Sequence, residues 1–370
     1  MRSADRRTGW AESPAASRTT RAVEGTAPTR RRRPPSPVKA VLHQIVATIR
    51  DHDMFEPGTR VVAAVSGGPD SMCLLHALWR LRRLLNVDLA CFHYDHGLRP
   101  ESGGDARYVA RQARTLGVPF ILRSAESKPP RGASVEAWAR TKRYGALATV
   151  LEELGGGVAA VGHTADDQAE TVLLGLLRGG GLEAVSGMAP VVKPIVRPLI
   201  EIEREQTVAF CRAIGLRPRR DPMNQDPVYM RVAVRGRVIP ALERALGRNI
   251  RSTLVRTAAL LREDAELLHE LATEAAGDVA TKDGQDTLLR VARLRELPKP
   301  LAARIVRAEL LAFSSLPETA HLDSVLSLAA GRPGRRVALP KGLLAKREKE
   351  YVRLSRPSLR QAPRRRPPAA

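Results

Sequence analysis

The sequence predicts an α/β protein in which a doubly wound, mostly parallel sheet is followed by a smaller, mainly helical domain. Three observations lead to this prediction. Between residues 60 and 200, short strand-like runs alternate with helical patterns, which is typical of parallel strands connected by helices. From about Glu201 the strand-like runs stop, and helical spacing dominates through Leu328. A chain of 370 residues is also long enough for two domains with tails.

The first strand, turn and helix of this series form the most informative segment. Val61–Val65 is an apolar run that suits a central parallel strand, and helical apolar spacing begins after the turn. The turn therefore lies at a helix N-terminus, where unpaired backbone N–H groups attract anions. Its candidate nucleotide-binding residues are Ser66, Gly67, Gly68, Pro69, Asp70 and Ser71. The turn lacks the endings of the commoner nucleotide loops, and a simple helix-starting turn is the alternative interpretation.

The other elements of the sheet domain are expected in order along the chain. An amphipathic helix at Val38–His52 precedes the first strand. The further strands are expected at Val87–Phe92, Val118–Leu122 and Val158–Val161. The helices between and after them are expected at Ala106–Leu116, Ser134–Leu154 and Asp166–Leu177.

Helices and one hairpin are expected beyond the sheet. The helical patterns span Glu201–Ile214, Val232–Leu246, Ile250–Ala276, Leu301–Leu311 and Thr319–Leu328. Arg336–Leu339 and Leu343–Leu354 suit a short hairpin around Pro340-Lys341-Gly342. We therefore divide the chain into a disordered basic tail (1–37), a catalytic domain (38–224), a mainly helical domain (225–354) and a second disordered basic tail (355–370).

The net charge of +22 favours an anionic partner, above all nucleic acid. Residues 1–37 carry nine arginines against three acidic residues, and residues 355–370 carry five arginines and no acidic residue. Half of the excess therefore lies in the tails, and the other half lies on the body.

Cysteine usage and hydropathy indicate the compartment. Cys73, Cys91 and Cys211 are far apart in apolar segments, so buried free thiols are expected rather than a disulfide or a cluster. We find neither an apolar run of membrane-spanning length nor a signal peptide. A cytoplasmic protein without a membrane partner is expected, and whether it forms a homodimer is left open.

Two further segments carry clustered polar residues near predicted strand ends. His93–Arg99 follows the second strand, where a polar turn capped by Asp95 is the alternative interpretation. Glu136, Arg140 and Arg143-Tyr144 share one predicted helix, and an ordinary surface ion pair between positions 136 and 140 is the alternative there.

The segment Gly162–Thr171 is the sharpest of these clusters. It places His163 at a strand end and three acidic residues in the first turns of a helix. Asp167 and Glu170 are three residues apart and share a helix face, where carboxylate oxygens can hold Mg²⁺ or a substrate ammonium group. Helix capping alone is the competing interpretation.

These motifs carry a resemblance. Ser66–Ser71 resembles the pyrophosphate-binding loop of the PP-loop ATP-pyrophosphatase superfamily. An ordered set of motifs, spread over roughly residues 38–245, is similar to the tRNA(Ile)-lysidine synthetase family. The set comprises Asp95–Arg99, the Glu136/Arg140/Arg143-Tyr144 helix, Gly162–Thr171, Arg178–Gly181 and Arg197-Pro198-Leu199.

The resemblance implies a reaction. ATP adenylates the carbonyl oxygen of the wobble cytidine in an isoleucine tRNA with a CAU anticodon, and free L-lysine then displaces AMP. The product, lysidine, changes codon reading from AUG to AUA. The implied cofactors are ATP and Mg²⁺.

The resemblance also suggests roles for single residues. Asp70 would position a metal ion or the reacting groups, and Asp167 and Glu170 would hold Mg²⁺ or the lysine ammonium group. His163 or Arg143 would contact phosphate or the lysine carboxylate. Two alternatives are a tRNA thiolase, which would need paired or clustered cysteines, and a non-catalytic RNA-binding protein with a relic nucleotide loop.

One region departs from the family pattern. The chain keeps Asp221, Asn224 and Asp226 but has Met223 and Val232 where the family has other residues. Arg231 and Arg235 are also kept, and they share one face of a predicted helix, so we expect them to grip tRNA phosphates.

Overall fold

The structure is a computed structural model that describes residues 36–98, 102–132, 134–219, 230–313 and 317–356. The two tails expected to be disordered fall almost entirely outside these residues. Arg99 and the divergent stretch Asp221–Asp226 lie outside them as well.

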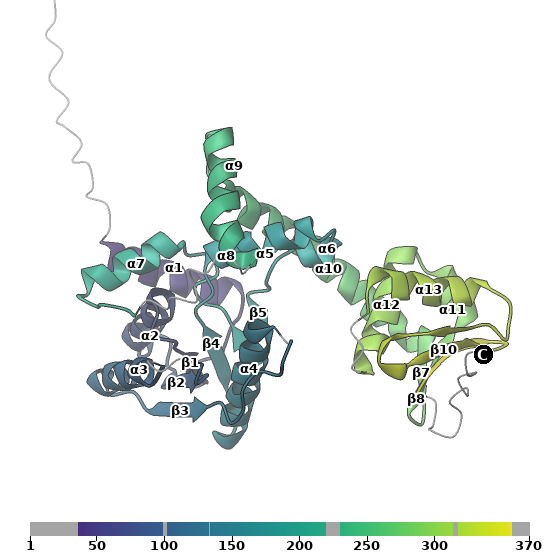
Figure 1. The fold of residues 1–370 in the computed structure, drawn as a ribbon, viewed down its shortest axis with the longest axis horizontal. Coiled ribbons are helices and arrows are strands. Elements are labelled where there is room, and N and C mark those ends of the chain that lie inside the picture. Colours follow the sequence, from purple (N-terminus) through teal and green to yellow (C-terminus); the bar gives the residue numbers. More distant parts are fainter. Residues whose placement is uncertain (1–35, 99–101, 133, 220–229, 314–316, 357–370) are drawn as a thin grey trace, which may run out of the picture. The chain divides into compact units, whose positions relative to one another are not determined.

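A six-stranded sheet forms the first half of the fold (Figure 1), and its strand order is β3-β2-β1-β4-β6-β5. Four neighbouring pairs are parallel, and β5 alone runs antiparallel to β6. The strands are β1 (Arg60–Ala64), β2 (Asp88–Asp95), β3 (Phe120–Ser124), β4 (Val158–Val161), β5 (Val191–Val192) and β6 (Ile195–Val196). The predicted mostly parallel sheet is confirmed.

Helices cover both faces of this sheet, as the prediction of a doubly wound fold requires. Alternate residues of β1 face opposite sides, since Val61 and Ala63 belong to one buried apolar cluster and Val62 belongs to another. The first cluster includes residues of α1 (Pro37–Asp51), α2 (Pro69–Leu81), α3 (Ser102–Leu116) and α7 (Arg204–Ala213). The second cluster includes α4 (Val135–Glu153), which lies on the other side of the strands in Figure 1.

Strand β2 is longer than predicted. His93 and Asp95, expected in a loop, lie in the strand because β3 pairs with them through Leu122 and Ser124. Asp95 also accepts a hydrogen bond from the backbone N–H of Gly97 at 2.9 Å, which is the capped turn considered as the alternative. The segment that the sequence predicts as a polar loop, from His93 onward, therefore consists mainly of the end of β2 and a turn capped by Asp95.

Helices follow the sheet. They are α5 (Ala165–Leu177), α6 (Leu182–Val185), α8 (Met230–Ala233), the π-helical turn η2 (Val234–Val238), α9 (Ile239–Leu246) and the long α10 (Ile250–Val279). Val234 and Ile239 are buried in one apolar cluster with Ala169 and Leu173 of α5. Residues 230–255 therefore pack on a helix of the sheet domain, although the sequence pattern assigns them to a second domain.

The last part of the chain holds a five-stranded antiparallel sheet of order β7-β8-β11-β10-β9. The predicted hairpin is present as β9 (Arg336–Ala338) and β10 (Leu344–Arg347), and the segment after β10 continues as a separate strand, β11 (Tyr351–Ser355). Strands β7 (Ala280–Asp283) and β8 (Asp286–Arg290) were not predicted. The helices packed with this sheet are α11 (Val291–Glu296), α12 (Lys299–Ala312) and α13 (Thr319–Ala330).

The expectation of a region dominated by helices after Glu201 is thus wrong for this sheet. Its first two strands are short, β7 is largely exposed and β8 buries only alternate residues, so neither has the apolar run that identifies a buried strand. In the part of the chain that the structure describes, no helix is both long enough and apolar enough to cross a membrane.

Candidate active site

The Ser66–Ser71 turn forms a tight loop between β1 and α2. Gly67 has φ of +95°, a conformation that favours glycine, and Pro69 opens the helix, where its missing N–H costs nothing. The Ser71 hydroxyl lies across the loop, accepting from the Ser66 N–H at 3.1 Å and donating to the Gly68 carbonyl at 3.0 Å. Among the described residues, no side chain caps the first turn of α2, so its N–H groups are left for an anion.

Gly162 brings the end of β4 against this loop. A Cβ at this position would lie 3.2 Å from backbone atoms of Asp70 and Ser71. The residues predicted at the ends of these two strands are therefore neighbours in space.

Helix α5 begins beside the loop with a capping box. The Thr164 hydroxyl accepts from the Asp167 N–H, and Asp167 Oδ2 accepts from the Thr164 N–H at 2.9 Å. The competing interpretation of Asp167 as a helix cap is therefore correct for one oxygen. Its other oxygen, Oδ1, takes no part in the cap and accepts hydrogen bonds from Arg204 and Arg235.

Three arginines contact the carboxylates of Asp70, Asp167 and Glu170. Arg204, at the start of α7, reaches all three, with N–O distances of 3.1, 2.9 and 3.4 Å. Thr207, one turn later, donates to the other oxygen of Asp70. Arg204 therefore ties the phosphate-loop residue to the two acids of α5.

The other two arginines, Arg231 and Arg235, lie on α8 and η2. Arg231 Nε is 3.0 Å from Glu170 Oε2, and Arg235 Nε is 2.6 Å from Glu170 Oε1. Arg235 also lies 3.3 Å from Asp167 Oδ1. These two arginines share one face, as predicted. Their guanidinium groups contact the buried carboxylates of Glu170 and Asp167, however, and the predicted contact with tRNA phosphates at the surface is not what this arrangement favours.

The ionisation of the carboxylates follows from burial and these contacts. Burial raises the pKa of Asp70 above its ordinary value, although Arg204 and Thr207 oppose that effect. Burial acts to raise the pKa of Asp167 too, but Arg204, the Thr164 N–H and Arg231 outweigh it and lower the pKa to about 2. Asp167 is therefore a permanent anion at neutral pH.

His163, at the end of β4, is neutral. Burial lowers its pKa to about 3, and Arg197 and Arg140 act in the same direction against the attraction of Asp167. Arg197 Nε donates to His163 Nδ1 at 3.2 Å, so the ring proton resides on Nε2. His163 can thus donate a hydrogen bond from Nε2 but cannot act as a cation.

The helix carrying Arg143 contributes a cationic and aromatic group. The guanidinium groups of Arg140 and Arg143 lie 5.0 and 5.5 Å from the centroid of the Tyr144 ring. Burial lowers the pKa of Arg143, and Tyr144 partly offsets this. Within the described residues, Arg143 has no ion pair with the three carboxylates, and Glu136 does not form the surface pair with Arg140.

The structure therefore brings together Ser66–Ser71, Asp167 and Glu170, with His163 one hydrogen bond from Arg197. The sequence interpretation missed Arg204 and Thr207 and gave Arg197 no role. Arg197 belongs to the motif Arg197-Pro198-Leu199, so the resemblance offered a signal that could have identified it. Arg204 stands in a segment with no motif, so spacing alone could not identify it.

Comparisons with known proteins show the family. Residues 38–242 match the family described as "PP-loop domain", and residues 289–356 match the "TilS substrate binding domain". The curated tRNA(Ile)-lysidine synthase of Salinispora tropica is 38% identical over 82% of this chain and 91% of its own length. The chain belongs to the tRNA(Ile)-lysidine synthase family. Family membership also supports the α/β fold with a second domain.

Other members of the family are longer. The tRNA(Ile)-lysidine synthase of Symbiobacterium thermophilum is 40% identical over 79% of this chain, but the match covers 64% of that protein. The chain thus spans just under two thirds of the length of this relative.

A solved structure supports the fold. The U34-tRNA thiolase NcsA of Methanococcus maripaludis, with its [4Fe-4S] cluster, has a TM-score of 0.53 and 16% identity, covering 61% of this chain and 80% of its own. At this identity the likeness concerns the fold alone.

Proposed function

We propose that this protein is an ATP-dependent ligase that joins free lysine to the wobble cytidine of the isoleucine tRNA with a CAU anticodon. One observation carries the proposal: Arg204 joins the phosphate-loop residue Asp70 to Asp167 and Glu170, so an anion-binding loop and an acidic centre share one site. The family to which the chain belongs performs chemistry that needs both.

The loop serves the first half of the reaction. The cytidine carbonyl oxygen attacks the α-phosphorus of ATP, forming an adenylated base and expelling pyrophosphate. Negative charge grows on the pyrophosphate as the bond breaks, and the free N–H groups at the start of α2 stabilise it. The hydroxyls of Ser66 and Ser71, 3.2 Å apart, lie at the same place.

The acidic centre serves the second half. The lysine ε-amine attacks the activated carbon, AMP leaves with the bonding electrons, and the amine loses a proton. Asp167, whose pKa is near 2, is a weak proton acceptor, and an ammonium group would have to replace an arginine contact at its Oδ1 oxygen. Asp70, whose pKa is raised, is the better acceptor. His163 and Arg143 are assigned to phosphate or to the lysine carboxylate.

Mg²⁺ does not fit Asp167 and Glu170 as the structure arranges them. Each of their four oxygens accepts from an arginine or from Thr164. The described residues also contain no group of three or more His, Cys, Asp or Glu side chains that could hold a metal ion. The use of Mg²⁺ and a homodimer stay predictions.

The thiolase alternative has less support. Cys73, Cys91 and Cys211 are all buried, and burial raises the pKa of Cys91 and Cys211 to about 12. Thiols of this kind are poor nucleophiles and poor cluster ligands at neutral pH.

Labelled lysine, ATP, Mg²⁺ and tRNA transcripts that differ only at the wobble base test the proposal. Label should enter only the transcript with wobble cytidine, with equal amounts of AMP and pyrophosphate released. Release of ADP, or incorporation that ignores the wobble base, would exclude this ligase.

Gly162→Ala tests the contact between β4 and the phosphate loop. The new Cβ would press on the backbone of Asp70 and Ser71 at 3.2 Å, so the loop must shift. We expect the KM for ATP to rise about tenfold, which corresponds to about 1.4 kcal/mol.

Gly145→Ala in α4 is the matched control, because nothing lies within 4 Å of its Cβ position. This change should stabilise the helix by about 0.5–1 kcal/mol and leave the KM for ATP unchanged. Equal KM values for the two variants would show that the Gly162 contact does not shape the loop.

A further inference from the structure

The chain from Met230 to Arg262 is unusually rich in arginine. It holds eight arginines, one glutamate and no other charged residue. The structure divides these arginines into two groups of four. The partly buried group is Arg231, Arg235, Arg251 and Arg262, and the exposed group is Arg237, Arg244, Arg248 and Arg256.

The partly buried group already has partners. Arg231 and Arg235 pair with Glu170, Arg251 pairs with Glu243, and Arg262 donates to the Ser186 carbonyl at 2.7 Å. Among the described residues, none of the exposed four has an ion pair with a carboxylate, and Arg244 donates only to the Pro240 carbonyl. The exposed group is therefore an uncompensated positive surface.

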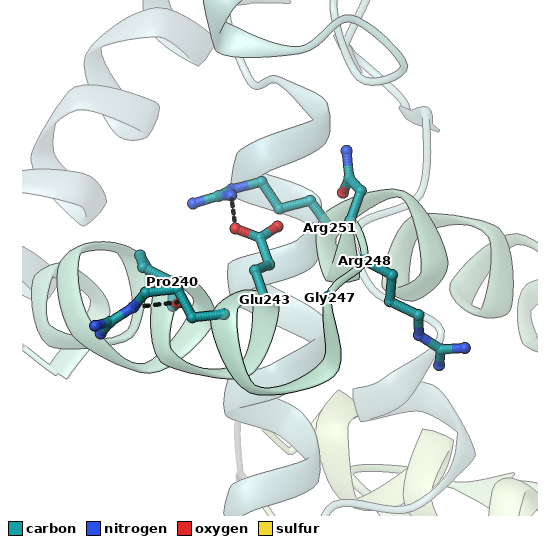
Figure 2. Close-up of a pocket in the computed structure, with 7 residues that line it drawn as sticks. Pro240, Glu243, Gly247, Arg248 and Arg251 are labelled. Atoms are coloured by element: carbon teal, nitrogen blue, oxygen red, sulfur yellow. Dashed lines mark hydrogen bonds and ion pairs between the residues drawn. The ribbon is translucent and has the colours of Figure 1, made fainter.

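Two of the exposed arginines line a surface pocket of about 600 Å³ at the corner between α9 and α10 (Figure 2). The lining is Pro240, Glu243, Arg244, Gly247, Arg248, Asn249 and Arg251. It contains no aromatic side chain on which a base could stack. Guanidinium groups without an aromatic platform suit phosphate oxygens rather than bases.

The pocket is connected to the catalytic carboxylates. Arg251 Nη1 lies 2.5 Å from Glu243 Oε2, which is the pair drawn in Figure 2, and its Nε lies 3.3 Å from Asp166 Oδ1. Asp166 directly precedes Asp167 and accepts from the Arg204 N–H at 2.7 Å. A polyanion bound at this corner therefore lies beside the site where the proposed reaction takes place.

We propose that Arg237, Arg244, Arg248 and Arg256 bind the phosphate backbone of the RNA substrate and position it against the catalytic carboxylates. This inference rests on the proposed function, since it assumes a tRNA substrate. It assigns backbone binding to these exposed arginines and not to Arg231 and Arg235, whose heads are held by Glu170. An acidic protein is the other polyanion that such a surface would attract.

The experiment measures tRNA binding against salt concentration for the full chain and for Arg244→Gln/Arg248→Gln. Loss of two phosphate contacts should lower the slope of log K against log salt by about 1.4 to 1.8. The control is Arg111→Gln/Arg114→Gln on α3, which removes the same charge from two other exposed arginines. The control should keep the slope of the wild-type protein.

Three outcomes would overturn the proposal: an unchanged slope in the pocket variant, an equal fall in both variants, or a loss of binding to polyglutamate that exceeds the loss to tRNA. Lysine incorporation by the wild-type protein is measured separately. If the wild type fails to incorporate lysine while the slopes behave as expected, the reaction assignment fails and the RNA surface stands. If it incorporates lysine while the slopes do not differ, only the surface assignment fails.

Discussion

Arg204→Ala should reduce lysine incorporation at least a hundredfold and destabilise the fold. Arg204 is the cation that links Asp70 to Asp167 and Glu170, and its removal leaves Asp70 without any ion pair among the described residues. Removing one partner from a buried ion network costs about 3 kcal/mol or more, because the remaining charges stay desolvated. Single-turnover rates and urea unfolding at neutral pH measure the two effects.

The pH dependence of stability gives a second readout of the same change. Arg204 helps to lower the folded-state pKa of Asp167 to about 2 from an ordinary 3.8. A lowered carboxylate pKa stabilises the fold above about pH 4, and this stabilisation is lost as the pH falls from 4 toward 2. Because the variant lacks this guanidinium, its unfolding free energy should depend less on pH across that window.

Arg204→Lys separates charge from geometry. A lysine keeps the positive charge but cannot contact three carboxylates with one planar group. It should recover most of the stability and little of the rate. If Arg204→Ala instead turns over normally, the link between the loop and the acidic centre is structural only.

Much of the first domain could be predicted because its signals are local. The apolar run Val61–Val65, followed by glycines and a helical pattern, specifies a buried strand, a tight turn and a helix start within twenty residues. The three further strands that the sequence predicts are present, with ends displaced by up to three residues, but the short strands β5 and β6 were not predicted. His93 is an example of such a displacement, because pairing with β3 extends β2 beyond its apolar run.

The acidic centre could be predicted only in part, since its partners come from distant segments. The spacing of Asp167 and Glu170 places them on one face of a single helix, so the sequence alone identifies them as a pair. Arg204 becomes their partner only through the packing of α7, which no local pattern records. Arg231 and Arg235 were recognised as a pair, but which way a helix face points depends on the core beneath it, here the buried contact of Val234 with α5.

The missed strands β7 and β8 had one usable signal. They are joined by Asp283-Gly284-Gln285-Asp286, in which Gly284 has φ of +61°. An Asp-Gly pair between short alternating runs is a strong sign of a hairpin. The runs themselves are polar on one face, so hydropathy did not reveal them.

Ser71→Ala should slow the adenylation step a hundredfold or more while changing stability by only about 1 kcal/mol. The Ser71 hydroxyl accepts from the Ser66 N–H, donates to the Gly68 carbonyl and lies 3.2 Å from the Ser66 hydroxyl. Its loss removes the bonds that hold the loop in shape and a hydroxyl that could turn from the Gly68 carbonyl toward a phosphate oxygen. Pyrophosphate release in a single turnover, with thermal unfolding in parallel, measures rate and stability on the same sample.

Ser66→Ala is the matched control for this change. Ser66 is exposed, and its hydroxyl receives only a long contact of 3.5 Å from the Gly68 N–H besides the contact with Ser71. Its removal takes away one hydroxyl without loosening the loop, so the adenylation rate should fall far less than in Ser71→Ala. If both serine variants slow the step equally, the hydroxyls act as two equivalent phosphate donors, and Ser71 has no separate role in shaping the loop. If neither variant slows it, the backbone N–H groups at the start of α2 bind the pyrophosphate without help from these side chains.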